Sequence, residues 1–251
     1  FKAGTTVSCV AQLLTNTPLR ICGRVTPRGT VSSRERGPGA HFLLWDHGRI
    51  ENLDGHAEAA LLELGPGDVM ITGANLIDAF GGAAMLAGSP GGNDGGRTIA
   101  AMASEGFQVI IAAGLEKLIP GTVGASILHS RRKGVSRSRG MACGLFPVAG
   151  QVVTEWEAIR MVAAVEACPI GRGGINGAEG GSVFQAWGPA EELEKLERVL
   201  ASCRDLPVAG EAVSLEECAY PCASCGGHLS CCYKAAGQKK KTVPATDKTL
   251  G

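Results

Sequence analysis

The sequence has few aromatic residues, no net charge and no long apolar run, and the last two absences exclude classes of function. Lysine and arginine together number 24, and aspartate and glutamate also number 24. No overall electrostatic field therefore favours nucleic acid or an anionic membrane surface. No apolar run approaches the roughly 20 residues that a membrane-spanning helix needs. We therefore expect neither a nucleic-acid partner nor a membrane partner.

Aromatic residues make up only 4% of the 251 residues, whereas glycine is abundant, with 37 residues. Together with 45% hydrophobic residues, this balance is typical of a loop-rich α/β enzyme or binding protein of one or two domains. The chain begins at Phe1 rather than at methionine, so we expect that a segment precedes it. Composition leaves open whether the protein is an enzyme and whether it forms a homo-oligomer.

The ten cysteines are unevenly placed. Five are scattered through apolar surroundings, where a free cysteine usually acts as a small core residue: Cys9, Cys22, Cys143, Cys168 and Cys203. The other five crowd a short C-terminal segment: Cys218, Cys222, Cys225, Cys231 and Cys232. A secreted disulfide framework would spread its cysteines along the chain. The pattern therefore predicts a reducing, cytoplasmic environment and a local site built by the second group.

A glycine-rich stretch from Gly65 to Gly96 dominates the first half of the chain. It opens with a short apolar strand, Val69 to Ile71, and ends just before a predicted helix over 97–104. Glycines let the backbone approach a ligand closely, and the free N–H groups of a helix start supply hydrogen-bond donors. The stretch predicts an anion-binding site, with the alternative that its glycines only form turns.

The N-terminal segment predicts a second part of the same site. Residues 1–14 have the apolar spacing of a helix, for which Thr5 or Thr6 would serve as N-cap. Gly4 would let an anion approach the end of that helix. The alternative is a plain capped helix. Further strands are predicted over 21–25 and 42–45, and a short helix over 55–64.

The best-defined strand runs from Phe107 to Ala113, and Glu116 and Lys117 follow its end. The alternation of strands and helices through this region predicts parallel pairing with right-handed crossovers. Open sheets of that kind bind ligands beyond the carboxyl ends of their strands. Glu116 and Lys117 are therefore candidate functional residues.

From residue 141 the pattern changes to that of a small ferredoxin-like α+β domain. A strand, a helix, two strands, a helix and a last strand are predicted over 141–148, 154–164, 168–187, 189–200 and 211–214. Thr154 would cap the first helix, with Glu157 three residues on. The predicted fold is an open, Rossmann-like parallel α/β sheet with this small domain and a Cys-rich tail. The corresponding domains are 1–130 (small-molecule binding), 141–215 (ferredoxin-like), 216–235 (Cys-rich, metal-binding) and 236–251 (disordered tail).

Short motifs in the chain resemble the superfamily of ribose-5-phosphate isomerase, related sugar isomerases and CoA-transferases. Residues 2–6, KAGTT, are similar to a phosphate-binding Gly-Thr loop ahead of the first helix. TGANLID from Thr72, followed by FGGAA, resembles an acidic strand end with its glycine cluster, and VIIAAGLEKLIPG resembles a later strand ending near a lysine. The resemblance covers most of residues 1–205. It implies the parallel α/β fold, a small-molecule pocket and the ferredoxin-like domain of some members.

The chain departs from this family where the isomerase chemistry is performed. That chemistry needs a carboxylate base and a lysine around the glycine cluster. Thr72 and Asn75 stand where the family has aspartates, and no lysine lies between Leu76 and Gly96. Asp78 is the nearest carboxylate. The resemblance therefore implies a related binding protein rather than a sugar isomerase.

The spacing Cys218-x3-Cys222-x2-Cys225-x5-Cys231-Cys232 is the most specific chemical signal in the sequence. Thiolates so close together can hold one tetrahedral zinc ion or one iron–sulfur cluster, since each needs about four soft ligands. The pattern leaves open which of the two is bound. The alternative to a metal is a group of free or redox-active thiols.

Two functions from different classes follow from these patterns. The first is a cytoplasmic α/β protein that binds a small anionic metabolite, such as a phosphorylated one. Its pocket would be formed by Gly4, Thr5, Thr6, Gly73, Asn75, Gly95, Gly96 and Thr98, with Asp78, Glu116 and Lys117 as candidate catalytic residues. Asp78 or Glu116 would move a proton and Lys117 would balance the charge. The second is a redox or electron-transfer accessory protein that works through its C-terminal iron–sulfur or zinc site. A zinc-stapled structural subunit is the third possibility.

Overall fold

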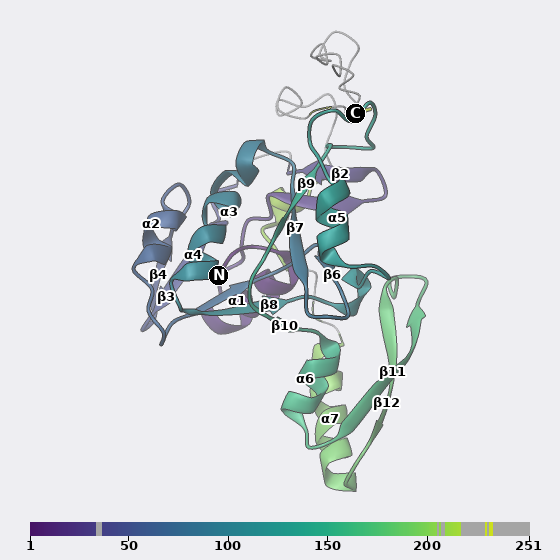
Figure 1. Cartoon of the computed structure of the whole chain (residues 1–251). Coiled ribbons are helices and arrows are strands. Elements are labelled where there is room, and N and C mark those ends of the chain that lie inside the picture. The colour runs from purple at the N-terminus through teal and green to yellow at the C-terminus, as the bar shows by residue number, and fades with distance from the viewer. Residues whose placement is uncertain (34–36, 205, 207–208, 217–228, 230, 233–251) are drawn as a thin grey trace.

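Figure 1 shows the computed structural model, which describes residues 1–33, 37–204, 206, 209–216, 229, 231 and 232. The chain is a mixed α/β protein with one parallel sheet of three strands and several small antiparallel sheets. No helix in the described part of the chain combines the length and apolar character needed to cross a lipid bilayer.

The parallel sheet has the strand order β10-β8-β5. Its strands are β5 (Val69–Thr72), β8 (Gln108–Ala112) and β10 (Gln151–Val153). Ile110 of β8 is the register partner of both Ile71 and Gln151. The apolar runs of β5 and β8 predict these two strands and their parallel pairing, which the structure confirms. The third strand, β10, is not among the strands that the sequence predicts for this sheet.

The N-terminal residues extend the sheet beyond β5. The N–H of Lys2 donates to the carbonyl of Ile71 (2.9 Å), and the N–H of Ala3 donates to that of His41 (2.8 Å). Lys2 also forms an antiparallel bridge with Phe42. Helix α1 (Thr5–Thr15) follows at once, as the apolar spacing predicts. Its N-cap is Gly4 in extended conformation, so the prediction of a threonine cap is wrong: Thr5 is already the first helical residue.

The glycine-rich stretch between β5 and β8 contains more regular structure than its sequence indicates. It forms β6 (Leu76–Ile77), β7 (Ala83–Ala87), η1 (Pro90–Gly92), α3 (Asn93–Arg97) and α4 (Ile99–Ser104). Strand β7 lies between β6 and β9 (Gly144–Pro147) in an antiparallel sheet of three strands. After β8 come η2 (Leu115–Lys117) and α5 (Val123–His129).

Two antiparallel hairpins and one helix complete this part of the chain. The hairpins are β1 (Gly23–Thr26) with β2 (Gly29–Ser32), and β3 (Leu43–Asp46) with β4 (Arg49–Asn52). Helix α2 (Ala57–Leu62) follows them. The predicted strands over 21–25 and 42–45 correspond to β1 and β3, and the predicted helix over 55–64 corresponds to α2.

A smaller unit stands off the parallel sheet (Figure 1). It consists of α6 (Glu155–Val162), the hairpin β11 (Glu166–Gly173) and β12 (Gly181–Trp187), and α7 (Ala190–Cys203). Ile159 and Leu196 of the two helices pack against Ala167 and Phe184 of the hairpin. The predicted capping box is confirmed: Thr154 accepts from the first turn of α6, and Glu157 accepts from the N–H of Thr154.

The pairing in this unit differs from the predicted arrangement in two places. The predicted strand over 141–148 is present as β9, but it pairs with β7, and β10, which precedes α6, pairs with β8; neither joins β11 or β12. The predicted last strand at residues 211–214 is wrong, because helix α8 (Ala212–Leu215) occupies this segment. Ser214 of α8 is fully buried, and its hydroxyl accepts from the N–H of Ile21 (3.0 Å).

We expect the substitution Gly96→Ala to lower the free energy of unfolding by about 2 kcal/mol, since a Cβ there would overlap the carbonyl oxygen of Gly91. Gly124→Ala in α5 is the matched control, because nothing lies within 4 Å of the Cβ that it would add. It should raise that free energy by roughly 0.5–1 kcal/mol. Urea unfolding followed by circular dichroism measures both changes. Equal effects of the two substitutions would contradict this account of α3.

Candidate functional site

Glycines follow three neighbouring strand ends at the carboxyl edge of the parallel sheet. Gly4 follows residues 1–3, Gly73 follows β5, and Gly114 stands two residues after β8. A Cβ on Gly73 would lie 3.7 Å from the carbonyl oxygen of Ala112 and 3.9 Å from Cγ2 of Val7. The start of α1 therefore lies beside the ends of β5 and β8. Gly4, Thr5, Thr6 and Gly73, predicted as ligand-binding residues, share this edge.

The helices after the first two strands cover opposite faces of the sheet. Val7 and Ala11 of α1 pack with Ile71 and Ala112 on one face. Ala101 and Met102 of α4 pack in the other core cluster with Met70 and Ile111. The junction between residues 1–3 and β5 is therefore a topological switch point. Open parallel sheets bind their ligands at such a junction, outside the carboxyl ends of the strands.

The N-terminus of α1 is open at this switch point. Gly4 provides no side-chain cap, and the first turn contains no acidic residue. The first N–H groups of a helix have no partner within the helix, and together with the helix dipole they favour an anion. Nothing lies within 4 Å of the position that a Cβ on Gly4 would occupy, and Thr5 and Thr6 are exposed. The helix start thus presents donors to open space.

In the part of the chain that the structure describes, only two charged side chains are buried, Lys2 and Asp78, each with 9% of its surface exposed. They differ in how their charge is met. The ammonium of Lys2 makes no hydrogen bond or ion pair with a described residue; its nearest aromatic ring is that of Phe42, 5.9 Å from Nζ to the ring centroid. Burial lowers the pKa of Lys2 from 10.5 to about 8. Lys2 is therefore a buried base whose charge the described residues leave unbalanced.

Lys2 also contacts the glycine-rich stretch. Its Cε lies 3.1 Å from the position that a Cβ on Gly95 would take. Gly95 in turn accepts from the buried hydroxyl of Thr98 (3.0 Å), which fixes the first turn of the helical segment α3–α4. Of the predicted ligand-binding residues, Gly95 thus lies against the Lys2 side chain, and Thr98 is bonded to Gly95. Gly96 packs closely against the carbonyl of Gly91 instead.

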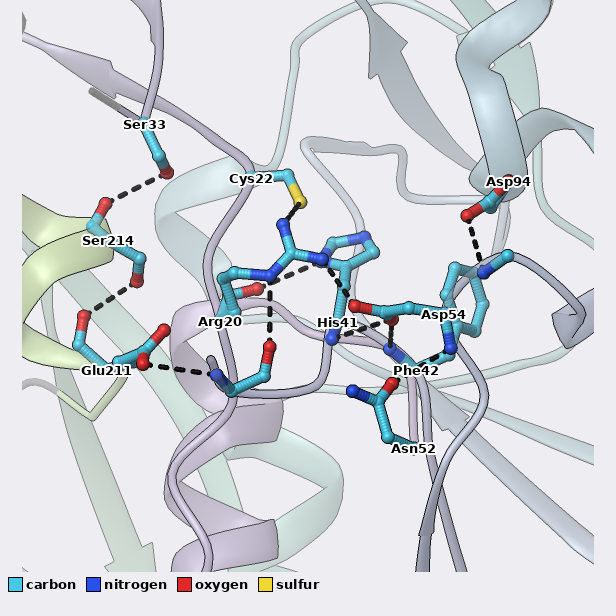
Figure 2. A network of polar contacts seen from close by, with 12 residues as sticks. Arg20, Cys22, Ser33, His41, Phe42, Asn52, Asp54, Asp94, Glu211 and Ser214 are labelled. Atoms are coloured by element: carbon cyan, nitrogen blue, oxygen red, sulfur yellow. Dashed lines mark hydrogen bonds and ion pairs between the residues drawn. The ribbon is translucent and has the colours of Figure 1, made fainter. Parts of the chain in front are cut away.

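A polar network beside Lys2 is centred on Arg20 (Figure 2). The Arg20 guanidinium donates to the carbonyl of Gly39 (3.0 Å) and to Sγ of Cys22 (3.0 Å), and forms an ion pair with Asp54. The other oxygen of Asp54 accepts from the backbone N–H groups of His41 and Phe42. Burial works to raise the pKa of Asp54, but these donors hold it below its usual value. The charges of Arg20 and Asp54 therefore compensate each other, and both side chains also bind backbone groups.

Two further titratable groups of this network, Cys22 and His41, are neutral at pH 7. Burial and the charge of Lys2 lower the pKa of His41 to about 3. Because Nδ1 of His41 lies 3.0 Å from the carbonyl oxygen of Arg20, Nδ1 carries the proton and Nε2 does not. Burial raises the pKa of the Cys22 thiol, although Arg20 and Lys2 oppose this rise. Neither the Cys22 thiol nor the His41 imidazole therefore supplies a negative charge that would offset that of Lys2.

Asp78 has a structural environment that contrasts with that of Lys2. One carboxylate oxygen accepts from the N–H groups of Phe80 (2.9 Å) and Gly82 (2.8 Å), and the other accepts from that of Val123 (2.8 Å). These donors, Val123 first, lower the pKa of Asp78. The carboxylate joins the β6–β7 turn to the start of α5. Its predicted role in proton transfer stays a prediction.

The remaining predicted residues lie at two places. Asn75 directly precedes β6, and its Oδ1 accepts from the N–H of Leu86 in β7 (2.9 Å), so this side chain links the start of β6 to β7. Glu116 and Lys117 lie in η2 beyond the carboxyl end of β8, as predicted, and form an ion pair of 3.6 Å. Because Lys117 is paired, its charge is less available to a ligand than that of Lys2.

The predicted metal ligands are only partly described. Cys218, Cys222 and Cys225 lie outside the described residues. Cys231 is buried and Cys232 is exposed, and the N–H of Cys232 donates to the carbonyl of Ser138 (2.9 Å). Within the described ranges no group of three or more His, Cys, Asp or Glu side chains is placed to hold a metal ion. The zinc or iron–sulfur site stays a prediction.

Comparisons with family models, with curated proteins and with solved structures find no match. The functional argument therefore depends on the geometry of the switch point alone.

Sequence reasoning includes Lys2 only within the KAGTT motif, without a role of its own, and misses Arg20, His41 and Asp54 as residues of this region. The signal for Lys2 is its position two residues before Gly4, in a segment that bridges Phe42 and bonds to β5. The signal for the other three is weak, because their approach depends on the pairing of the segments around Arg20 and His41.

We expect Lys2→Met to stabilise the protein at pH 7, because a buried ammonium without a partner is destabilising. The pKa of Lys2 is lower in the folded than in the unfolded chain, so the unfolded state binds more protons between about pH 8 and 10.5. The free energy of unfolding of the wild type should therefore rise relative to that of Lys2→Met across this range, by on the order of 3 kcal/mol at most. Urea unfolding at several pH values measures the difference.

The matched control is Lys117→Met, whose parent side chain is half-buried and paired with Glu116. It should change the free energy of unfolding at pH 7 by less than about 1 kcal/mol. A constant difference between wild type and Lys2→Met from pH 7 to 10.5 would show that the Lys2 amine does not titrate as described.

We expect Asp78→Ala to lower the free energy of unfolding at pH 7 by about 2–3 kcal/mol, since three backbone donors lose a charged acceptor. The contribution of Asp78 is present above its unfolded pKa of about 3.9 and is lost as the pH falls through its lower folded pKa. The difference between wild type and variant should therefore shrink below about pH 4. Denaturant unfolding at pH 7 and in acid tests this.

Asp68→Ala serves as the comparison, because the exposed Asp68 carboxylate accepts only from the N–H of Gly65 (2.8 Å). It should lower the free energy of unfolding by about 0.5–1 kcal/mol. A loss at Asp78 no larger than this would mean that its three contacts do not tie α5 to the β6–β7 turn.

Proposed function

We propose that the protein binds a small anionic metabolite, such as a phosphorylated one, at the switch point between residues 1–3 and β5. The observation that carries this proposal is the buried ammonium of Lys2, which has no anionic partner among the described residues. A buried charge is strongly unfavourable unless another charge or a set of hydrogen bonds compensates it. A bound anion would supply that compensation.

The surroundings of Lys2 support an anion rather than a cation or a neutral ligand. The N-terminus of α1 offers free N–H donors and a favourable dipole, and Thr5 and Thr6 add hydroxyl groups. The carboxylates on the elements beside Lys2 already have partners: Asp54 pairs with Arg20, and Asp94 accepts from the N–H of Gly55 and lies 3.8 Å from Arg97.

The resemblance to the ribose-5-phosphate isomerase superfamily supports the same proposal. In this chain the segment KAGTT leaves the sheet beside β5 and begins the first helix, as a phosphate-binding loop of that superfamily would. We propose a Rossmann-like arrangement on this ground, with a function other than sugar isomerisation. Asp78, the carboxylate nearest to the glycine cluster, is occupied by backbone donors, and this favours binding over isomerase chemistry.

The cysteines support a cytoplasmic setting for this function. Seven of them lie in the described residues, from Cys9 to Cys232, and all seven are free thiols there. Free thiols persist where the surroundings are reducing. We keep Glu116 as a candidate for proton transfer, since it lies beyond the end of β8, on the edge where the anion would bind.

We expect inorganic phosphate to bind the full chain and Lys2→Met to weaken that binding by about tenfold or more, which corresponds to roughly 1.4 kcal/mol. Lys117→Met should change it by less than about threefold, because Lys117 is paired with Glu116. Isothermal titration calorimetry at pH 7, with phosphate and sulfate as ligands, measures the dissociation constants.

Lys2→Arg separates charge from shape in the same titration, since arginine keeps the positive charge and should retain most of the affinity. Unchanged affinity in Lys2→Met, or a larger loss in Lys117→Met, would rule out Lys2 as the charge that receives the anion.

A further inference from the structure

The groups that face Lys2 leave its amine unusually easy to deprotonate. Cys22 and His41 are neutral at pH 7, and Asp54 is paired with Arg20. On the helix α3 that contacts the Lys2 stem, Asp94 accepts from the N–H of Gly55 (3.2 Å) and lies 3.8 Å from Arg97. No carboxylate of these neighbours is bonded to the ammonium. This electrostatic environment is that of a reactive lysine rather than of a structural one.

A larger fraction of Lys2 side chains than of ordinary lysine side chains therefore carries a neutral amine at pH 7. With a pKa of about 8, about one amine in ten is unprotonated at pH 7. For an ordinary lysine with a pKa near 10.4 the fraction is roughly one in 2,500. The neutral amine is the nucleophilic form, so Lys2 has an advantage of more than two orders of magnitude in reactive population.

Lys2 lies close to the switch point, in surroundings that leave its amine without a described partner. Its backbone lies two residues before the open helix start at Gly4, and 9% of its surface is exposed. Its stem passes Gly95, where the absence of a side chain leaves room for it. The Phe42 ring provides an apolar wall, which favours the neutral amine over the ammonium.

We propose that Lys2 forms an imine with an aldehyde or ketone group of the anionic ligand. The inference rests on the proposed function, since it assigns a chemical class to the ligand of the same site. The lone pair of the neutral Nζ attacks the carbonyl carbon, an N–C bond forms, and the C=O π bond breaks as a proton passes from Nζ to the oxygen. The carbon–oxygen bond then breaks, and the oxygen leaves as water with a proton from solvent. The product is a protonated imine.

The charge balance of this step fits the site. The neutral amine, the carbonyl and one proton give an iminium and water, so the resting ammonium and the final iminium each carry one positive charge at Nζ. The anionic group of the ligand can therefore remain at the start of α1 before and after the covalent step. The ligand class is a small molecule that carries both an anionic group and a carbonyl group.

Reductive trapping tests the inference on the full chain. The wild type is incubated at pH 7 with glyoxylate, an anionic aldehyde, and sodium cyanoborohydride, and peptide mass mapping locates the adduct. Fragmentation separates Nζ of Lys2 from the α-amino group of the chain. We expect Lys2 to be modified at least tenfold faster than any other lysine, with a rate that rises with pH around 8. Lys2→Met should lose this fast modification, and Lys117→Met should keep it.

The remaining arms separate this inference from the proposed function. Inorganic phosphate should slow trapping by glyoxylate, and the neutral propionaldehyde should react more slowly at Lys2 than glyoxylate does. Phosphate binding that depends on Lys2, without selective trapping, would overturn the imine and leave anion binding intact. Selective trapping that is indifferent to phosphate and equally fast with propionaldehyde would support the reactive amine and overturn the anion site. Modification spread evenly over the lysines would overturn the inference.

Discussion

The candidate site depends on two backbone hydrogen bonds made by the first three residues. The N–H of Lys2 donates to Ile71 and the N–H of Ala3 donates to His41, so the N-terminal segment is held between β5 and the strand region of Phe42. This pairing buries the Lys2 side chain and places Gly4 at the edge where β5 ends. It also sends α1 to the face opposite α4. Without it, the lysine would be an exposed residue near a chain end, and the helix start would face no strand end.

The two buried ionic residues of the described chain differ in the groups that surround their charge. Asp78 is surrounded by three N–H donors and contributes to the connection between distant elements. Lys2 has an aromatic ring and a glycine for neighbours. A protein gains stability from the first arrangement and loses it through the second. A feature that destabilises the fold and lies where parallel sheets bind ligands points to function, because strain of this kind concentrates at functional sites.

The parts of the fold that the sequence predicts well are those encoded by local patterns. The apolar runs of β5 and β8 and the capping box of Thr154 and Glu157 need no distant contact to be recognised. The hairpin of β6 and β7 is missed because a two-residue strand and an Ala-rich strand between glycines carry no clear periodicity. The segment around Ser214 is taken for a strand because its helical turn is stabilised by a bond to Ile21, more than 190 residues away.

The same distinction holds for the site. The glycines at positions 4, 73 and 95 are found from the sequence, because glycine after a strand or before a helix has a local meaning. The burial of Lys2 is not, since it depends on pairing with Ile71 and Phe42, which no local pattern encodes. Likewise, the ion pair between Lys117 and Glu116 depends on the side-chain conformation of Lys117, which the sequence motif does not predict.

The small unit formed by α6, α7 and the hairpin is attached to the carboxyl edge at two points. Its base continues directly from β10, and a carboxylate of α6, Glu155, accepts from the N–H of Leu115 (2.8 Å). The far end of the hairpin returns to the same edge, where a Cβ on Gly180 would lie 2.8 Å from Cβ of Glu116. The small unit is thus held at the carboxyl edge through both α6 and the turn of the hairpin. A change in the length of the hairpin turn should therefore displace η2. The geometry of the carboxyl edge thus depends partly on a segment about 60 residues further along the chain.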